Sequence, residues 1–131
     1  MKESSLILYD NFFIDASIGT PCSVEFNFEK AWEFKKSIKD FDPKLLKFYH
    51  VHPEGFLDYS DIDLNCIKGL NIAMGCPVYF SIITFLNNDL NEHYYHQISY
   101  KYLDKQMEKV EDIPLMFNYS FLLKYLSYFG G

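Results

Sequence analysis

The segment LLKFYHVHPEGFLDYSDID, residues 45–63, decides how the chain can fold. Its first part, Leu45–His52, is an apolar run that ends before a proline, which is typical of a buried strand. Its last part begins at Ser60, a residue type that favours the N-cap of a helix. The helix is expected to reach about Met74, with Gly75 as its C′ residue. A strand, a loop and a helix therefore form the centre of the predicted fold.

Further strands and helices are predicted on both sides of this segment. Apolar runs and period-two alternation favour strands, and a change to a period near 3.6 favours helices. The predicted strands are Ser5–Tyr9, Phe12–Ala16, Cys22–Phe28, Cys76–Leu86 and His93–Tyr102, and the predicted helices are residues 28–41 and Leu115–Phe129. Because strands and helices mix without strict βαβ alternation, the fold class is α+β (mixed α/β). Neither a linker nor a repeat divides the chain, so residues 1–131 are expected to form a single domain.

The composition narrows the classes of function. The 131 residues carry a formal net charge of −6, which argues against binding to a nucleic-acid backbone. No apolar stretch approaches the roughly 20 residues that span a bilayer, and the start lacks the pattern of a secretion signal, so we expect no membrane partner. The three cysteines show no CxxC spacing, which favours a reducing compartment, the cytoplasm, over a disulfide framework.

Three side chains of the central segment suggest a metal site. His50 and His52 are two residues apart on a predicted strand, so they point to the same face. Asp63 falls in the first turn of the following helix. Two histidines and one carboxylate, with one open position, are typical of a catalytic rather than a structural zinc site. The alternative is that Ser60 and Asp63 form only a capping box and that the histidines are polar rim residues.

The joint spacing of these residues matches a known signature. His-x-His, seven residues, Ser, two residues and Asp resembles the motif of the JAMM (MPN-plus) zinc metalloproteases. The resemblance implies a curved mixed β-sheet flanked by helices, similar to a cytidine-deaminase-like sandwich. The order of predicted elements over residues 3–86 agrees with that arrangement. The resemblance also implies Zn²⁺ held by His50, His52 and Asp63, with the Ser60 hydroxyl stabilising the oxyanion of the reaction.

The same family uses a glutamate at the start of an early strand as its general base. Glu3, in the stretch Glu3-Ser4-Ser5-Leu6, is the candidate by its spacing from the histidines, although Leu6 stands where the family has glycine. Glu25 and Glu29 are the alternatives. Glu25 lies on the polar face of a predicted strand, and Glu29 suits the first turn of a helix.

The resemblance implies a zinc-dependent peptidase or isopeptidase. Its substrate would be an amide bond after the Gly-Gly tail of ubiquitin, a ubiquitin-like protein or a sulfur-carrier protein, bound as an extended C-terminal tail. Two alternatives remain open: a non-catalytic MPN-type binding module, and a processing protease for another phage or prokaryotic protein. The predicted helix Leu115–Phe129 is expected to dock on the core, and a contact between copies in a homo-oligomer is its alternative use.

Overall fold

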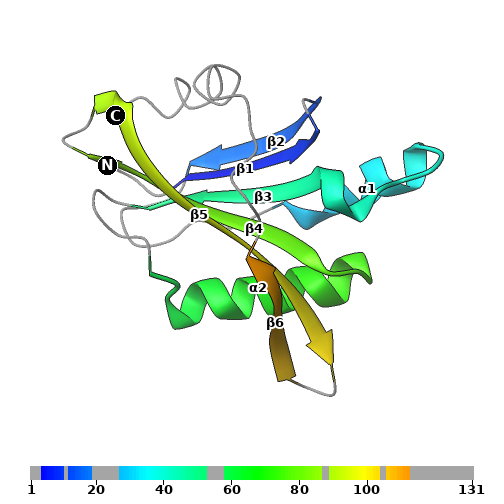
Figure 1. Cartoon of the computed structure of the whole chain (residues 1–131). Coiled ribbons are helices and arrows are strands. Elements are labelled where there is room, and N and C mark those ends of the chain that lie inside the picture. Colours follow the sequence, from blue (N-terminus) through cyan, green and yellow to red (C-terminus); the bar gives the residue numbers. More distant parts are fainter. Residues whose placement is uncertain are drawn as a thin grey trace.

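The computed structural model describes residues 4–10, 12–18, 27–52, 58–86, 89–103 and 106–112. These residues form a six-stranded mixed sheet with two α-helices, an α+β arrangement (Figure 1). In chain order the elements are β1 (Ser4–Tyr9), β2 (Phe12–Ile18), α1 (Phe28–Ser37), the 3₁₀ helix η1 (Pro43–Leu45), β3 (Leu46–Val51), α2 (Asp61–Met74), β4 (Val78–Leu86), β5 (Asp89–Leu103) and β6 (Gln106–Asp112).

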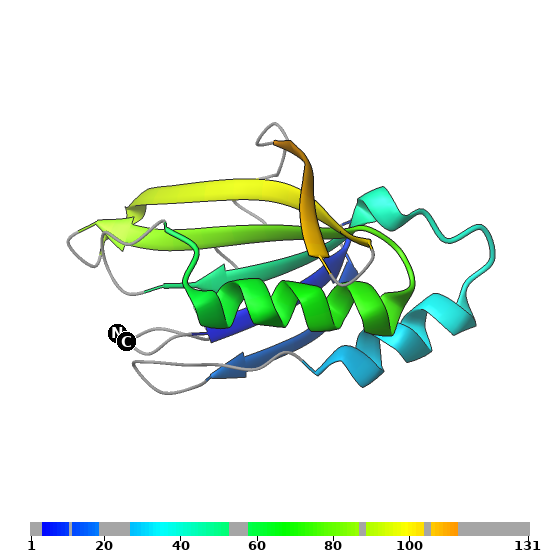
Figure 2. The same cartoon turned by 90° about the horizontal axis from the view of Figure 1, so that it is seen from below.

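The strand order of the sheet is β2-β1-β3-β4-β5-β6. Every neighbouring pair is antiparallel except β3 and β4, which are parallel. A parallel pair needs a crossover connection, and α2 supplies it. The helix must therefore run back along the sheet, which places its N-terminus beside the carboxyl end of β3 (Figure 2).

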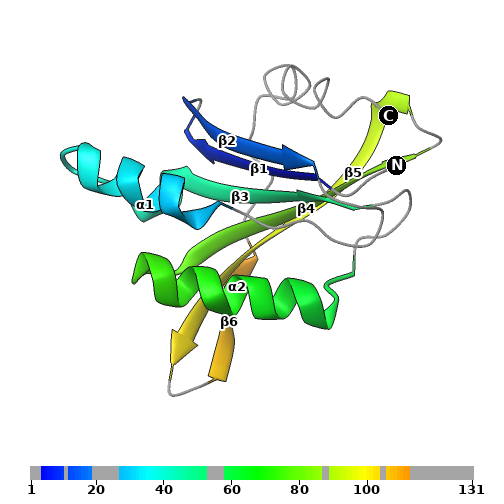
Figure 3. The same ribbon diagram turned by 180° about the vertical axis from the view of Figure 1, so that it is seen from behind.

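The core lies between the sheet and α2 (Figure 3). Phe48 of β3 and Phe80 of β4 are fully buried and face each other in register across the parallel pair. Ile67 and Met74 of α2 are also fully buried in the same cluster. The other face of the sheet also has fully buried residues: Val51 of β3, Leu6 of β1 and Ile83 of β4. Both faces of the central strands are thus covered, which explains their continuous apolar sequences.

The last two strands give the sheet its curvature. β5 is 15 residues long, and its far half turns with β6 past the C-terminal part of α2 (Figures 1 and 2). β6 was not among the predicted strands. Its sequence, QMEKVED, contains four charged residues, and Val110 is half exposed. Pairing with β5, rather than an apolar face, makes this edge segment a strand.

Most of the predicted elements are confirmed to within a few residues. The first two runs form an antiparallel hairpin, and β3, β4 and β5 match the predicted strands. The central helix is confirmed at both ends: Ser60 is its N-cap, and Gly75 has the left-handed φ of +64° that a glycine accepts without strain. Two parts of the prediction lie outside the described residues: the strand Cys22–Phe28 up to residue 26, and the helix Leu115–Phe129.

The prediction for the first helix was wrong in its end and in how much of it is buried. The helix starts at Phe28 as predicted, which takes this residue out of the predicted strand Cys22–Phe28, but α1 ends at Ser37 rather than at residue 41. Of the residues of α1 only Ala31 is buried, whereas Trp32 is 39% exposed. The helix packs beside β2 and α2 at the end of the sheet instead of across it, so it buries a narrow strip (Figure 3). No helix in the described ranges is long and apolar enough to span a membrane.

Candidate metal centre

The two histidines sit where β3 ends, on the face of the sheet that α2 covers. His50 shares this face with Phe48 because side chains alternate along a strand. It is paired in register with Ser5 of β1 and Ile82 of β4. His52 follows the strand, and its backbone N–H donates to the carbonyl of Ile83 at 2.8 Å. Both histidines are only 5% exposed, so their imidazole rings lie inside the protein.

Asp63 is brought to the histidines by the N-terminus of α2. The Ser60 backbone N–H and hydroxyl donate to Asp63 Oδ2 at 2.9 and 3.0 Å, and the Asp63 N–H donates to Ser60 Oγ at 3.1 Å. This is a complete capping box. Asp63 Oδ1 lies 2.6 Å from His50 Nδ1. The capping box and the His-His-Asp cluster are therefore not alternatives, because one buried carboxylate takes part in both.

The three side chains have a geometry that suits a metal ion. His52 Nε2 lies 3.2 Å from His50 Nδ1 and 3.3 Å from Asp63 Oδ1. A circle through these three atoms has a radius of about 1.8 Å, so a point at the usual metal–ligand distance of about 2.0–2.1 Å from all three exists. The buried group His50, His52 and Asp63 could therefore hold a metal ion.

The electrostatics keep Asp63 ionised. Burial disfavours the charged carboxylate and by itself raises its pKa. Hydrogen bonds from His50, His52 and the Ser60 backbone, together with the charge of His50, outweigh burial and hold the pKa of Asp63 well below its usual range. The N-terminal end of the α2 dipole also favours a negative charge here. A carboxylate that stays charged is ready to bind a cation without first losing a proton.

Phe80 forms an apolar wall beside the cluster, and Tyr59 in turn contacts Phe80. The Phe80 ring meets the His50 ring edge-on with centroids 6.2 Å apart, and Tyr59 lies 6.0 Å from Phe80. Phe80 lies in the predicted strand Cys76–Leu86, but it was not among the predicted site residues. The parallel pairing of β3 with β4 connects Phe80 with the site, and the sequence contains no local signal for it.

The remaining predicted site residues differ in what the structure describes. Ser60 is placed as predicted beside Asp63, and its hydroxyl hydrogen is directed to the carboxylate. Glu3 lies outside the described residues, as does Glu25. The strand that follows Glu3 begins at Ser4, which is paired with Val51, the residue between the two histidines. Glu29 lies in the first turn of α1 as expected. No protein-family model matches the chain, and comparison with curated proteins finds no match either.

The double hydrogen bonding of Ser60 predicts a role in positioning Asp63. Replacing Ser60 by Ala removes the cap of α2 and one of the two bonds to Asp63 Oδ2, so we expect a loss of about 1 kcal/mol in unfolding free energy. The affinity of the cluster for a metal ion should fall by about 10-fold. Urea denaturation and isothermal titration with Zn²⁺ measure the two effects. Ser37→Ala, which removes an exposed hydroxyl at the end of α1, is the control and should change stability by less than about 0.5 kcal/mol.

Proposed function

We propose that this protein is a zinc metallopeptidase of the JAMM type. One observation carries the proposal: the His-x-His strand end and the Ser-x-x-Asp helix start come together, with one ligand atom from each of His50, His52 and Asp63 within 4.8 Å of the other two. The strand, crossover helix and parallel strand that bring them together have the order expected for this family. We also propose that the chain has the JAMM fold, with which the six-stranded mixed sheet is compatible.

Zinc is the metal that suits this ligand set best. Two imidazoles and one carboxylate are typical of catalytic zinc sites, while Ca²⁺ and Mg²⁺ prefer oxygen ligands alone. Zn²⁺ held by such ligands supplies a Lewis acid that makes water a nucleophile near neutral pH. The chain's own part is to hold His50, His52 and Asp63 in place and to limit their contact with bulk water, which their burial achieves.

Glu3 and Ser60 are the proposed catalytic partners. Glu3 would accept the proton of the attacking water and return it to the leaving amine. Ser60 would turn its hydroxyl from Asp63 to the oxyanion of the substrate. The structure offers a reason why this turn is tolerable: the backbone N–H of Ser60 also donates to Asp63 Oδ2, at 2.9 Å, so the carboxylate keeps one anchor when the hydroxyl leaves.

The proposed substrate is the amide bond after a Gly-Gly tail of ubiquitin, a ubiquitin-like protein or a sulfur-carrier protein. Glycines leave the backbone free of side chains, so such a tail can approach a buried centre closely. The second candidate function is a non-catalytic MPN-type binding module. It is favoured by the position of the Ser60 hydroxyl, whose hydrogen is engaged by Asp63. Within the described residues Cys66 and Cys76 form no disulfide, which supports the proposal of a reducing compartment such as the cytoplasm.

Metal analysis combined with a cleavage assay tests the proposed function. Protein purified without added metal is expected to carry about one zinc per chain, and a panel of Gly-Gly-linked fusion proteins should include one that it cleaves. His50→Ala should lose both the zinc and the cleavage. Zinc without cleavage of any fusion would favour the binding module, while protein that neither carries nor takes up zinc would contradict both functions.

A further inference from the structure

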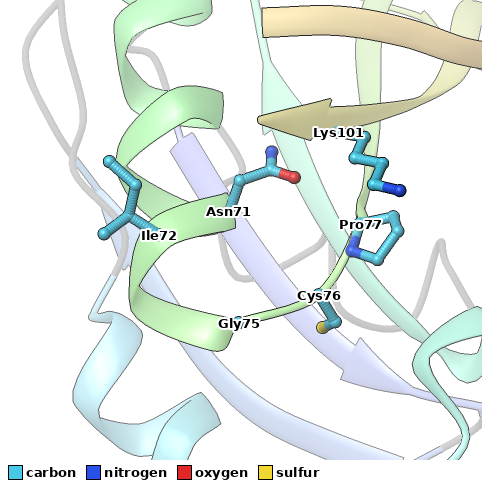
Figure 4. Close-up of a pocket in the computed structure, with 6 residues that line it drawn as sticks. All are labelled: Asn71, Ile72, Gly75, Cys76, Pro77 and Lys101. Atoms are coloured by element: carbon cyan, nitrogen blue, oxygen red, sulfur yellow. The ribbon is translucent and has the colours of Figure 1, made fainter. Parts of the chain in front are cut away.

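A pocket lies at the end of α2 that is remote from the His-His-Asp cluster. The helix has 14 residues, so its two ends are about 21 Å apart. The pocket has a volume of about 420 Å³, which is within the range of small-molecule sites. Figure 4 shows its lining: Asn71, Ile72, Gly75, Cys76, Pro77 and Lys101. These residues come from the last turn of α2, the segment leading to β4, and β5.

Asn71 is the unusual member of this lining. Its side chain is 95% buried, since the residue is only 5% exposed. The amide nitrogen donates to the carbonyl of Ile67 at 2.8 Å, whereas no residue in the described part of the chain donates a hydrogen bond to Asn71 Oδ1. Turning the amide over would set oxygen against oxygen, so the bond to Ile67 fixes its orientation. Figure 4 shows the amide directed from α2 toward the side of the pocket where Pro77 and Lys101 lie. A buried acceptor without a protein donor is rare, and its donor is then an ordered water molecule or a group on a ligand; the adjoining pocket has room for a ligand.

The other groups determine what kind of molecule fits. Lys101 is exposed and contributes a positive charge, so it favours an anionic group on the ligand. The carbonyl end of α2 would repel an anion, but Lys35 Nζ donates to the Met74 carbonyl at 2.6 Å and offsets that effect. Burial raises the pKa of the Cys76 thiol, against the opposing charge of Lys35, so this side chain is neutral. Ile72 adds an apolar surface.

We propose that this pocket binds a carboxylate with an N–H donor beside it, the group –NH–CHR–COO⁻. The N–H donates to Asn71 Oδ1, and the carboxylate pairs with Lys101. The same group occurs in a free N-acyl amino acid and at the carboxyl terminus of a peptide. This ligand site is separate from the proposed peptidase function and does not depend on a metal at His50, His52 and Asp63.

Titration of the full-length chain, followed by two-dimensional NMR, tests the site. The probes are N-acetylglycine, the peptide Ala-Ala-Gly-Gly and, as a carboxylate without the N–H donor, acetate. N-acetylglycine or the peptide should shift the Asn71 side-chain amide signals and bind at least 10-fold more tightly than acetate. Tighter binding of N-acetylglycine would identify a small metabolite as the ligand, and tighter binding of the peptide would identify a protein terminus.

Two variants separate this site from non-specific binding of anions. Lys101→Gln, a substitution at an exposed residue that should leave the fold intact, should weaken binding at least 10-fold, whereas the exposed control Lys44→Gln should change it less than twofold. Asn71→Leu should also abolish binding, but its buried position makes Lys101 the safer test. Equal binding of acetate and N-acetylglycine, equal effects of the two lysine variants, or no shift of the Asn71 signals would overturn the proposal. His50→Ala should bind the probes normally, so a failure here is distinguishable from a failure of the peptidase proposal.

Discussion

Asp63→Asn should weaken binding of Zn²⁺ by at least about 100-fold. The substitution preserves the size of the side chain and an oxygen that can still accept from Ser60, so α2 should keep its start. It removes the negative charge that faces His50 at 2.6 Å and His52 at 3.3 Å. Because Asp63 is 1% exposed, its carboxylate acts inside the protein, where the loss of its charge is little screened by bulk water. Isothermal titration of metal-free protein with Zn²⁺ measures the loss directly.

Asp61→Asn is the matched control for this experiment. Asp61 lies two residues earlier in the same first turn of α2, and it is exposed. Its replacement removes the same charge from the same helix end, which costs about 0.3–1 kcal/mol of stability, and should leave zinc affinity within about threefold. If Asp61→Asn and Asp63→Asn weakened zinc binding equally, general electrostatic attraction rather than a ligand at Asp63 would explain the binding.

The parts of the site that follow local rules were predictable from the sequence. His50 and His52 share a face because a strand has a period of two. Ser60 and Asp63 adopt their positions because Ser is a strong N-cap and the residue three positions later reaches back to it. Both rules act within a few residues of the chain. They do not depend on what the segment packs against, which is why strand, cap and helix end were correct.

The parts that depend on tertiary pairing were not predictable from one sequence. Phe80 became part of the site only because β4 lies parallel to β3, and β6 is a strand only because β5 offers a partner. Trp32 is exposed because α1 lies at the end of the sheet, which its own periodicity could not reveal. From the sequence alone, the capping box and the metal site are competing interpretations of Asp63. The structure allows both, since a carboxylate has two oxygens.

Phe80→Ala should cause the largest loss of stability among the substitutions considered, about 3–5 kcal/mol in unfolding free energy. Phe80 is fully buried at the centre of the core, where it faces Phe48 and contacts the rings of His50 and Tyr59. Its removal leaves a cavity that the rigid parallel strands cannot close completely. Urea denaturation of the metal-free protein measures the loss without a contribution from bound zinc.

The control for this substitution is Phe12→Ala, the same chemical change at a residue that is 59% exposed on β2. Phe12 stacks on Phe34, so a loss below about 1 kcal/mol is expected. Phe80→Ala should further weaken Zn²⁺ binding by about 10-fold, because His50 loses the wall that orients its ring, while Phe12→Ala should leave it unchanged. Phe80→Leu, which refills most of the cavity, should restore much of the unfolding free energy and much of the Zn²⁺ affinity. A zinc affinity that is identical in Phe80→Ala and Phe12→Ala would show that the ring does not orient His50, even where the stability loss is as large as expected.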